Sequence, residues 1–228
     1  MSELIDTTEM YLRTIYELLE EGIEPRRARI VERLRHSGPT VSQTVARMER
    51  DGLLTLDEDR LIQLTQTGHA TAVDVMRRHR LVERLLVDVI GLELELVHKE
   101  ACRWEHVVSQ AVEERLAVLL SDPARSPFGN PIPAADDAGA GAISSFREGN
   151  LPLSEIVDRD TVRVTVRRIG EQLQQSDCLA DLLAAGVSPD VSVEVQTVTR
   201  GVRIVGPTAE IVIPDAAAEH LFVSLDPA

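Results

Sequence analysis

The stretch that decides the fold of the N-terminal part reads Arg27-Ala-Arg-Ile-Val-Glu-Arg-Leu34, then a turn at His36-Ser-Gly38, then Pro39-Thr-Val-Ser-Gln-Thr-Val-Ala-Arg-Met-Glu-Arg50. The apolar residues of the last segment recur at helical spacing, and the residues between them are polar or basic. Two short helices joined by a tight glycine-containing turn, the second polar and basic outside, are typical of a helix-turn-helix. The pattern indicates DNA binding; the alternative is a small helical domain with an arginine-rich, solvated face.

The flanking segments extend this stretch to a winged helix. Residues 3–21 carry apolar side chains at helical spacing, and a glycine and a proline follow them. After the second helix, Leu53-Leu-Thr-Leu56 and Leu61-Ile-Gln-Leu64 flank a polar turn, as in a β-hairpin. Between Pro25 and Arg50 there are seven arginines and two glutamates, a local net charge of +5. The sequence therefore predicts a basic, N-terminal winged helix-turn-helix.

The chain as a whole is acidic, with a net charge of -14 over 228 residues, which argues against non-specific binding to nucleic acid or acidic membranes. Its two cysteines, Cys102 and Cys178, lie far apart without a disulfide framework, so we expect free thiols in a reducing compartment. No signal-peptide pattern is visible, and no apolar run approaches the roughly 20 residues of a membrane span. We therefore expect a cytoplasmic protein without a membrane partner.

Three more helices are predicted over residues 65–91, 93–109 and 111–120. Their apolar faces exceed what a three-helix domain of this size needs. A homodimer interface is therefore expected, and the alternative is a purely intramolecular core.

The C-terminal part reads as a small all-β domain behind a linker. Residues 121–147 are rich in proline, glycine and alanine, which indicates a linker that is flexible in its second half. Alternating apolar residues predict strands over 161–167, 191–195, 202–205 and 210–213, and Asp177–Ala185 reads as a short helix with Ser176 as N-cap and Gly186 as C-cap. The fold class is mainly α with a small, mostly antiparallel β domain. We expect domains over 1–72 (DNA binding), 73–140 (helical, dimerisation and metal binding) and 148–228 (the β barrel).

The helix predicted over 93–109 collects metal-ligating side chains. Four of them share about a quarter of the helix circumference: His98, Cys102, Glu105 and His106. Thiol, imidazole and carboxylate together suit a first-row transition metal better than Ca²⁺ or Mg²⁺. His79 and Glu83, four residues apart on the preceding helix, could join His98 in another site, and Met10 could add a sulfur from the first helix. The plainer alternative is a polar helix face with one buried cysteine.

Catalysis is not expected from these residues. Cys102-Arg-Trp-Glu105-His106 resembles the inverted zincin order His-x-x-Glu-His with a cysteine in the first position. A thiolate ligand would reduce the Lewis acidity on which such hydrolysis depends. A Cys–His nucleophile pair lacks an orienting Asn or Asp, and the sequence contains no glycine-rich phosphate loop.

Several stretches of the first 140 residues resemble the iron-dependent regulator and diphtheria toxin repressor family of metal-activated transcriptional repressors. The stretches that carry the resemblance are Asp6-Thr-Thr-Glu-Met10-Tyr-Leu-Arg-Thr-Ile-Tyr16, Ser37-Gly-Pro-Thr-Val-Ser-Gln-Thr-Val45, Met48-Glu-Arg-Asp-Gly-Leu-Leu54, His79-Arg-Leu-Val-Glu-Arg-Leu-Leu-Val-Asp-Val-Ile-Gly-Leu92, Glu100-Ala-Cys-Arg-Trp-Glu-His106 and Ser126-Pro-Phe-Gly-Asn-Pro-Ile-Pro133. The C-terminal part matches more weakly, and its pattern is similar to the family's SH3-like domain.

The resemblance implies two metal sites per chain. One, the switch site, would use Met10, Cys102, Glu105 and His106. The other, ancillary, would use His79, Glu83, His98, Glu171 and Gln174. The implied metal is Fe²⁺, with Co²⁺, Ni²⁺, Zn²⁺ and Mn²⁺ as substitutes in vitro.

The resemblance also implies a DNA contact surface on a homodimer that binds double-stranded operator DNA. Residues matching family contacts to the DNA backbone are Arg27, Ala28, Ser37, Thr40, Ser42, Arg47, Arg50 and Arg60. Pro39 and Gln43 match positions facing bases, where Gln can bond an adenine edge and Pro can pack on a thymine methyl. The implied function is Fe²⁺-dependent repression of iron-homeostasis genes.

Two alternatives stay open. One is a Mn²⁺-responsive regulator of the same superfamily. The other is a DNA-binding regulator whose C-terminal barrel senses a peptide or protein, because an SH3-like fold does not by itself establish a function.

Overall fold

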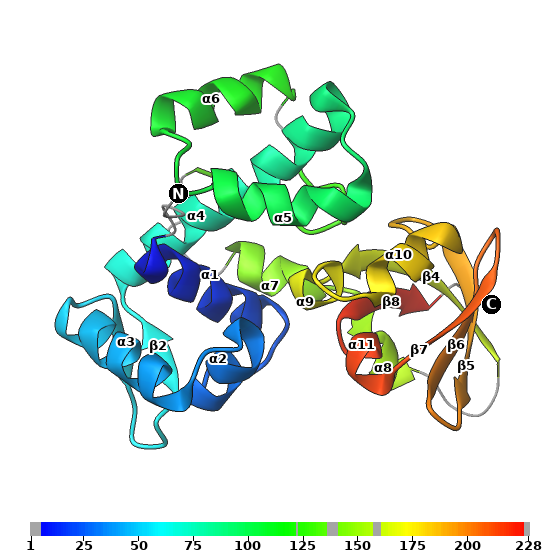
Figure 1. The fold of residues 1–228 in the computed structure, drawn as a ribbon, viewed down its shortest axis with the longest axis horizontal. Helices are drawn as coiled ribbons and strands as arrows, with labels where there is room; N and C mark the ends of the chain where they lie inside the picture. Colours follow the sequence, from blue (N-terminus) through cyan, green and yellow to red (C-terminus); the bar gives the residue numbers. More distant parts are fainter. Residues whose placement is uncertain (1–5, 122, 136–140, 157–160, 226–228) are drawn as a thin grey trace.

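The computed structural model describes residues 6–121, 123–135, 141–156 and 161–225. Helices form the N-terminal half, and an antiparallel sheet with short helices forms the C-terminal domain (Figure 1). None of the helices in these ranges combines the length and the apolar character needed to cross a bilayer.

The N-terminal part is the predicted winged helix-turn-helix. Its elements are α1 (Thr7–Glu20), α2 (Arg27–Leu34), α3 (Gly38–Arg50), β1 (Leu54–Leu56) and β2 (Ile62–Leu64). The two strands pair antiparallel, as the sequence predicted. Apolar side chains of the three helices and both strands share one core, so the position of α1 is coupled to that of α3.

The turn between α2 and α3 differs in detail from the prediction. The left-handed residue is Arg35, with φ of 53°, whereas Gly38 is already the first residue of α3. Ser37 is the N-cap of α3, and its hydroxyl accepts a hydrogen bond of 3.3 Å from the backbone N–H of Thr40.

A second helical group follows, made of α4 (Gln66–Leu85), the π-helical segment η1 (Leu86–Ile90), α5 (Leu94–Trp104) and α6 (Gln110–Leu119). The predicted helix 93–109 is wrong at its C-terminal end. The backbone N–H groups of Val107 and Val108 both bond the carbonyl of Trp104, at 3.0 and 3.1 Å, which tightens the last turn of α5 and redirects the chain.

The predicted linker 121–147 also requires correction. Residues Gly141–Arg147 form α7, which packs on α1, and positions 136–140 lie outside the described residues. Phe146 is buried edge-to-face against Phe222 with ring centroids 5.0 Å apart, and the Arg168 guanidinium lies 4.7 Å from the Phe146 centroid. Aromatic packing thus turns this segment into a helical connection between α1 and the C-terminal domain (Figure 1).

The C-terminal domain is built on a six-stranded antiparallel sheet with the strand order β3-β8-β4-β5-β6-β7. Its strands are β3 (Leu151–Pro152), β4 (Val162–Ile169), β5 (Ser192–Val198), β6 (Gly201–Val205), β7 (Glu210–Ile213) and β8 (Leu221–Leu225). Its short helices are α8 (Leu153–Ile156), α9 (Glu171–Gln174), α10 (Cys178–Ala184) and α11 (Asp215–Ala218). The four predicted strands are present, whereas β3 and β8 were not predicted. The N-cap of α10 is Asp177, not Ser176, whose hydroxyl donates to the Leu173 carbonyl instead.

Candidate metal centre

The candidate donors come from four places in the fold. His79 and Glu83 lie on α4, His98 and Cys102 on α5, and Glu105 at the C-terminal end of α5. His106 follows in the turn, and Met10 lies on α1. Since α5 ends at Trp104, the donors do not share one face of a longer helix, and the turn after α5 brings His106 back toward α1.

One compact cluster consists of His79, Glu83 and His98, all of them buried. Their ligand atoms lie within 4.8 Å of one another, with His79 Nε2 3.0 Å and His98 Nδ1 3.6 Å from Glu83 Oε1. Glu83 Oε2 is buried without a hydrogen-bond donor among the described residues. A cation would satisfy this orphaned oxygen, so the cluster fits a divalent metal ion.

A second cluster consists of His79, Cys102 and Glu105, again with ligand atoms within 4.8 Å of one another. His79 Nδ1 lies 2.6 Å from Glu105 Oε2, so the two nitrogens of one imidazole face the two clusters. Thiol, imidazole and carboxylate form a mixed donor set that suits a first-row transition metal.

The structure places the other two residues of the predicted switch site next to this cluster. His106 Nε2 lies 3.3 Å from Glu105 Oε1, and His106 Nδ1 lies 2.6 Å from Glu9 Oε2. Met10 lines a cavity of about 370 Å³ together with Cys102, Glu105 and His106. The four residues predicted for the switch site therefore border one cavity.

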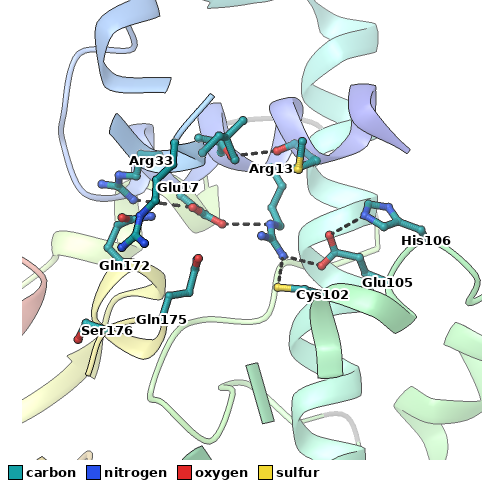
Figure 2. A pocket seen from close by; sticks show the side chains of 13 residues that line it. Arg13, Glu17, Arg33, Cys102, Glu105, His106, Gln172, Gln175 and Ser176 are labelled. Carbon is teal, nitrogen blue, oxygen red and sulfur yellow. Dashed lines mark hydrogen bonds and ion pairs between the residues drawn. The ribbon is translucent and has the colours of Figure 1, made fainter. Parts of the chain in front are cut away.

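Arg13 on α1 was not predicted, and it occupies the middle of this centre (Figure 2). Its Nη1 lies 2.7 Å from Glu105 Oε2, 3.2 Å from Cys102 Sγ and 3.1 Å from His79 Nδ1. Its Nε lies 3.1 Å from Glu17 Oε1. One signal could have indicated it, because Arg13 follows Met10 by three residues and therefore shares its helix face.

The charges of the centre are set by burial and by these contacts. Burial alone would raise the pKa of the Cys102 thiol, but Arg13 and His98 lower that pKa to about 6. Burial likewise opposes ionisation of Glu105, yet Arg13 and His79 lower its pKa to about 2. At neutral pH the centre therefore presents a thiolate and carboxylates, the forms that bind metal ions.

Glu171 and Gln174 are bonded to other groups, although Gln174 lines a cavity together with His98 and Cys102. Glu171 Oε1 lies 2.7 Å from Arg80 Nη2, and Gln174 Nε2 donates to the Ile169 carbonyl at 2.6 Å. Their role as metal ligands stays a prediction.

The residues predicted to contact DNA lie on α2, on α3 and its N-terminal turn, and in the turn between β1 and β2. In α3, Val41, Val45 and Met48 are buried in the core. All ten residues predicted to contact DNA are exposed or partly exposed, namely Arg27, Ala28, Ser37, Pro39, Thr40, Ser42, Gln43, Arg47, Arg50 and Arg60. Arg33, counted in the local charge, faces inward instead, with Nη2 2.6 Å from Glu21 Oε2.

Comparison with known proteins agrees with both the candidate metal centre and the helix-turn-helix described above. Two family models match: the DNA-binding domain of iron-dependent repressors over residues 3–61, and their metal-binding and dimerisation domain over 65–134. The iron-dependent repressor IdeR of Mycobacterium tuberculosis is 56% identical over 227 residues, which cover 98% of this chain and 99% of the relative. The chain belongs to the iron-dependent repressor family.

Other members of the iron-dependent repressor family and related regulators show the same relationship. The diphtheria toxin repressor of Corynebacterium diphtheriae is 53% identical, with 86% of each chain covered. Among solved structures, a manganese-dependent transcriptional repressor in complex with manganese is 28% identical, with a TM-score of 0.76 over 96% of this chain and 100% of that one. In this iron-dependent repressor family member, Met10 and Arg13 thus belong to the DNA-binding domain, whereas the donors on α4, α5 and the following turn belong to the metal-binding domain.

Metal binding by this member of the iron-dependent repressor family is expected to weaken as the pH falls, because protons compete for the ligands. Burial lowers the pKa of His79, but Glu83 and Glu105 raise it to about 9. His79 is therefore a positively charged imidazolium at pH 7.5, and it must lose one proton before it can bind a metal ion. Each proton that metal binding releases should raise the Co²⁺ affinity by up to about tenfold per pH unit between pH 7 and pH 9. Calorimetric titration in buffers of different ionisation enthalpy measures this release, and affinity that is constant over this range would contradict it.

Proposed function

We propose that this chain is a transcriptional repressor that binds operator DNA as a homodimer when Fe²⁺ is bound, and that it controls iron-homeostasis genes. One observation carries the proposal: α1, a helix of the DNA-binding domain, lies against the metal-ligating side chains on α4 and α5. Met10, Cys102, Glu105 and His106 would hold Fe²⁺ in the switch site. His79, Glu83 and His98, with Glu171 and Gln174, would hold it in the ancillary site.

The mechanism follows from where these residues lie. Bound Fe²⁺ would supply a double positive charge shared by ligands on α1 and α5. Met10 would then tie α1 to α5, and α1 shares its core with α3, so α3 would be held in one position relative to the dimerisation helices. Two α3 helices fixed in this way could enter successive major grooves. The coupling is reciprocal, so operator DNA should tighten metal binding by the same factor.

Fe²⁺ is favoured over Mn²⁺ as the physiological ion by the chemistry of the donors. A thioether and a thiolate are soft ligands, and they suit Fe²⁺ better than Mn²⁺. Relatives at 49–56% identity are iron-dependent repressors and diphtheria toxin repressors, whereas the manganese-dependent repressor is 28% identical. The test is to place a selected operator before a reporter gene and ask which ion restores repression. Repression by Mn²⁺ alone in metal-depleted cells would support the manganese alternative.

We also propose that the centre is regulatory, with no reaction assigned to it, and that the protein acts in the cytoplasm, where its DNA target lies. A thiolate among the ligands would lower the Lewis acidity of a bound ion.

The homodimer is proposed from the apolar residues on the second helical group. Among the described residues, eight of the eleven exposed large hydrophobic side chains lie on η1, α5, α6 or the turn between α5 and α6: Val89, Ile90, Leu96, Trp104, Val107, Val112, Val118 and Leu119. Figure 1 places α6 on the far side of α4 from α3, so a dimer formed there would leave α3 free for DNA. Exposed apolar side chains concentrated on neighbouring helices in this way are typical of a protein–protein interface.

Introducing charge into this face should convert the dimer into a monomer. The double variant Val118→Glu/Leu119→Glu would bury two carboxylates in the interface, which costs several kcal/mol unless they are paired. Analytical ultracentrifugation at micromolar concentration measures the mass. The matched control is Val212→Glu, which changes an exposed valine (55% against 66% for Val118) on β7 in the C-terminal domain and should leave the dimer intact. A variant that stays dimeric would rule out this face.

Base readout by Gln43 gives a separate prediction. An operator is first selected from random duplexes with the metal-loaded protein. Gln43→Ala should lose about 1–3 kcal/mol of discrimination at one base pair, because a glutamine amide can bond an adenine edge. Arg47→Ala, a change in an exposed arginine on the same helix, should weaken binding to every sequence alike. Fluorescence anisotropy with single-base-pair variants measures both effects, and unchanged discrimination by Gln43→Ala would exclude it as a reader.

A further inference from the structure

The buried guanidinium of Arg13 occupies the place where a cation is needed. One of its nitrogens contacts the thiol of Cys102, the carboxylate of Glu105 and the imidazole of His79, at 3.2, 2.7 and 3.1 Å. The side chain is only 6% exposed, so water does not screen these contacts. Figure 2 shows the guanidinium pointing between Cys102 and Glu105, with Glu17 on its other side.

Arg13 supplies the charge that this group of anions requires. Cys102 and Glu105 contact it as anions, and burying such anions without a counterion costs several kcal/mol for each. Glu17 contacts it from the other side, and burial raises the pKa of that carboxyl to about 7. The same contacts raise the pKa of Arg13 well above its ordinary value against the effect of burial, so the guanidinium stays charged. Without a metal ion, Arg13 is thus the cation that contacts Cys102, Glu105 and Glu17 together, and it offsets their charge in the folded interior.

The same contacts exclude a metal ion from two of the predicted ligands. A transition metal binds thiolate sulfur at about 2.3 Å and carboxylate oxygen at about 2.0–2.2 Å, so its centre falls in the space where the Arg13 nitrogen lies. Charge repulsion adds to this steric conflict. The adjoining cavity of about 370 Å³ is lined by Arg13, Glu17, Gln172 and Gln175, which gives the side chain room to withdraw while it keeps a carboxylate partner.

We propose that Arg13 is a resident counterion which must leave Cys102 and Glu105 before a divalent cation can bind there, and that this competition raises the metal concentration needed for activation. The inference rests on the proposed metal-dependent function. Because Arg13 and Met10 both lie on α1, the exchange replaces one link between α1 and α5 by another. Arg13 is therefore a positioning residue that sets the sensitivity of the switch.

The test is a Co²⁺ titration of the full-length protein, followed by the charge-transfer absorption of a thiolate–Co²⁺ bond. Arg13→Gln removes the competing charge, and its Co²⁺ dissociation constant should be at least about tenfold lower than that of wild type. The urea midpoint of the metal-free variant should fall, whereas that of the Co²⁺-loaded variant should change little.

The matched control is Arg77→Gln, which removes a largely buried arginine that contacts Glu113 and the Pro133 carbonyl, none of the donors and none of the partners of Arg13. It should destabilise both forms alike and leave the Co²⁺ dissociation constant within about twofold of wild type. Arg13→Lys keeps a charge for folding, but a single ammonium group cannot hold Cys102, Glu105 and Glu17 together, so its dissociation constant should fall by about threefold or more.

An unchanged or higher dissociation constant in folded Arg13→Gln would overturn the inference, as would an unchanged constant in Arg13→Lys if Arg13→Gln does not fold. Failure of the proposed function looks different, because operator binding by wild type would then be independent of the metal, whatever the Co²⁺ dissociation constants of the variants.

Discussion

Replacing Cys102 by alanine is expected to abolish most of the metal activation of operator binding, a loss approaching 100-fold in affinity. Cys102 provides the one thiolate of the centre, and Arg13 and His98 lower its pKa to about 6 although burial would raise it. Alanine removes the softest ligand and with it much of the preference for Fe²⁺. Fluorescence anisotropy under anaerobic conditions, with saturating Fe²⁺ or with chelator, gives the two dissociation constants.

The chain contains its own control for this substitution. Cys178 at the start of α10 is the second free cysteine, partly buried against the core of the C-terminal domain. Cys178→Ala removes the same atom type and should keep the full metal response. If Cys102→Ala responds to Fe²⁺ as strongly as Cys178→Ala does, Cys102 is not a ligand of the switch.

Replacing Arg80 by alanine is expected to lower the free energy of unfolding by about 3–5 kcal/mol. Arg80 on α4 has no exposed surface, and its guanidinium lies 2.6 Å from Glu20 Oε2 on α1 and 2.7 Å from Glu171 Oε1 on α9. It also donates to the Pro131 carbonyl at 2.6 Å. Without Arg80, two buried carboxyl groups lose their counterion, and one carbonyl loses its donor.

Urea denaturation of the metal-free protein measures this loss. Arg84→Ala, one turn further along α4, serves as the control because its ion pair with Asp88 is about one-third exposed. Partly exposed pairs of this kind contribute up to about 1 kcal/mol. An equal effect of the two substitutions would show that Arg80 does not hold α1, α4 and α9 together.

Features that depend on local sequence were predictable. The spacing of apolar residues and the turn before Pro39 located α2 and α3 to within one residue, and the alternation of Leu61–Leu64 located the second strand of the hairpin. Donor types at helical spacing likewise indicated a metal site. These patterns depend on neighbours within a few positions, which a single sequence contains.

Features that depend on distant contacts were not predictable. The sequence places Arg13 on the helix face of Met10, but it does not show the contact of Arg13 with Glu105, which is 92 positions away. The end of α5 at Trp104 depends on backbone bonds in the next turn, and α7 depends on the packing of Phe146 against Phe222. Sequence periodicity contains none of this information.

The central claim is that metal occupancy controls the DNA affinity of the full-length protein. The most direct measurement is an anisotropy titration of a selected operator duplex with chelator-stripped wild type, repeated after addition of Fe²⁺ at the same ionic strength. Affinity about 100-fold higher with Fe²⁺ is the predicted result. Equal affinity of the stripped and the Fe²⁺-loaded protein would contradict the claim.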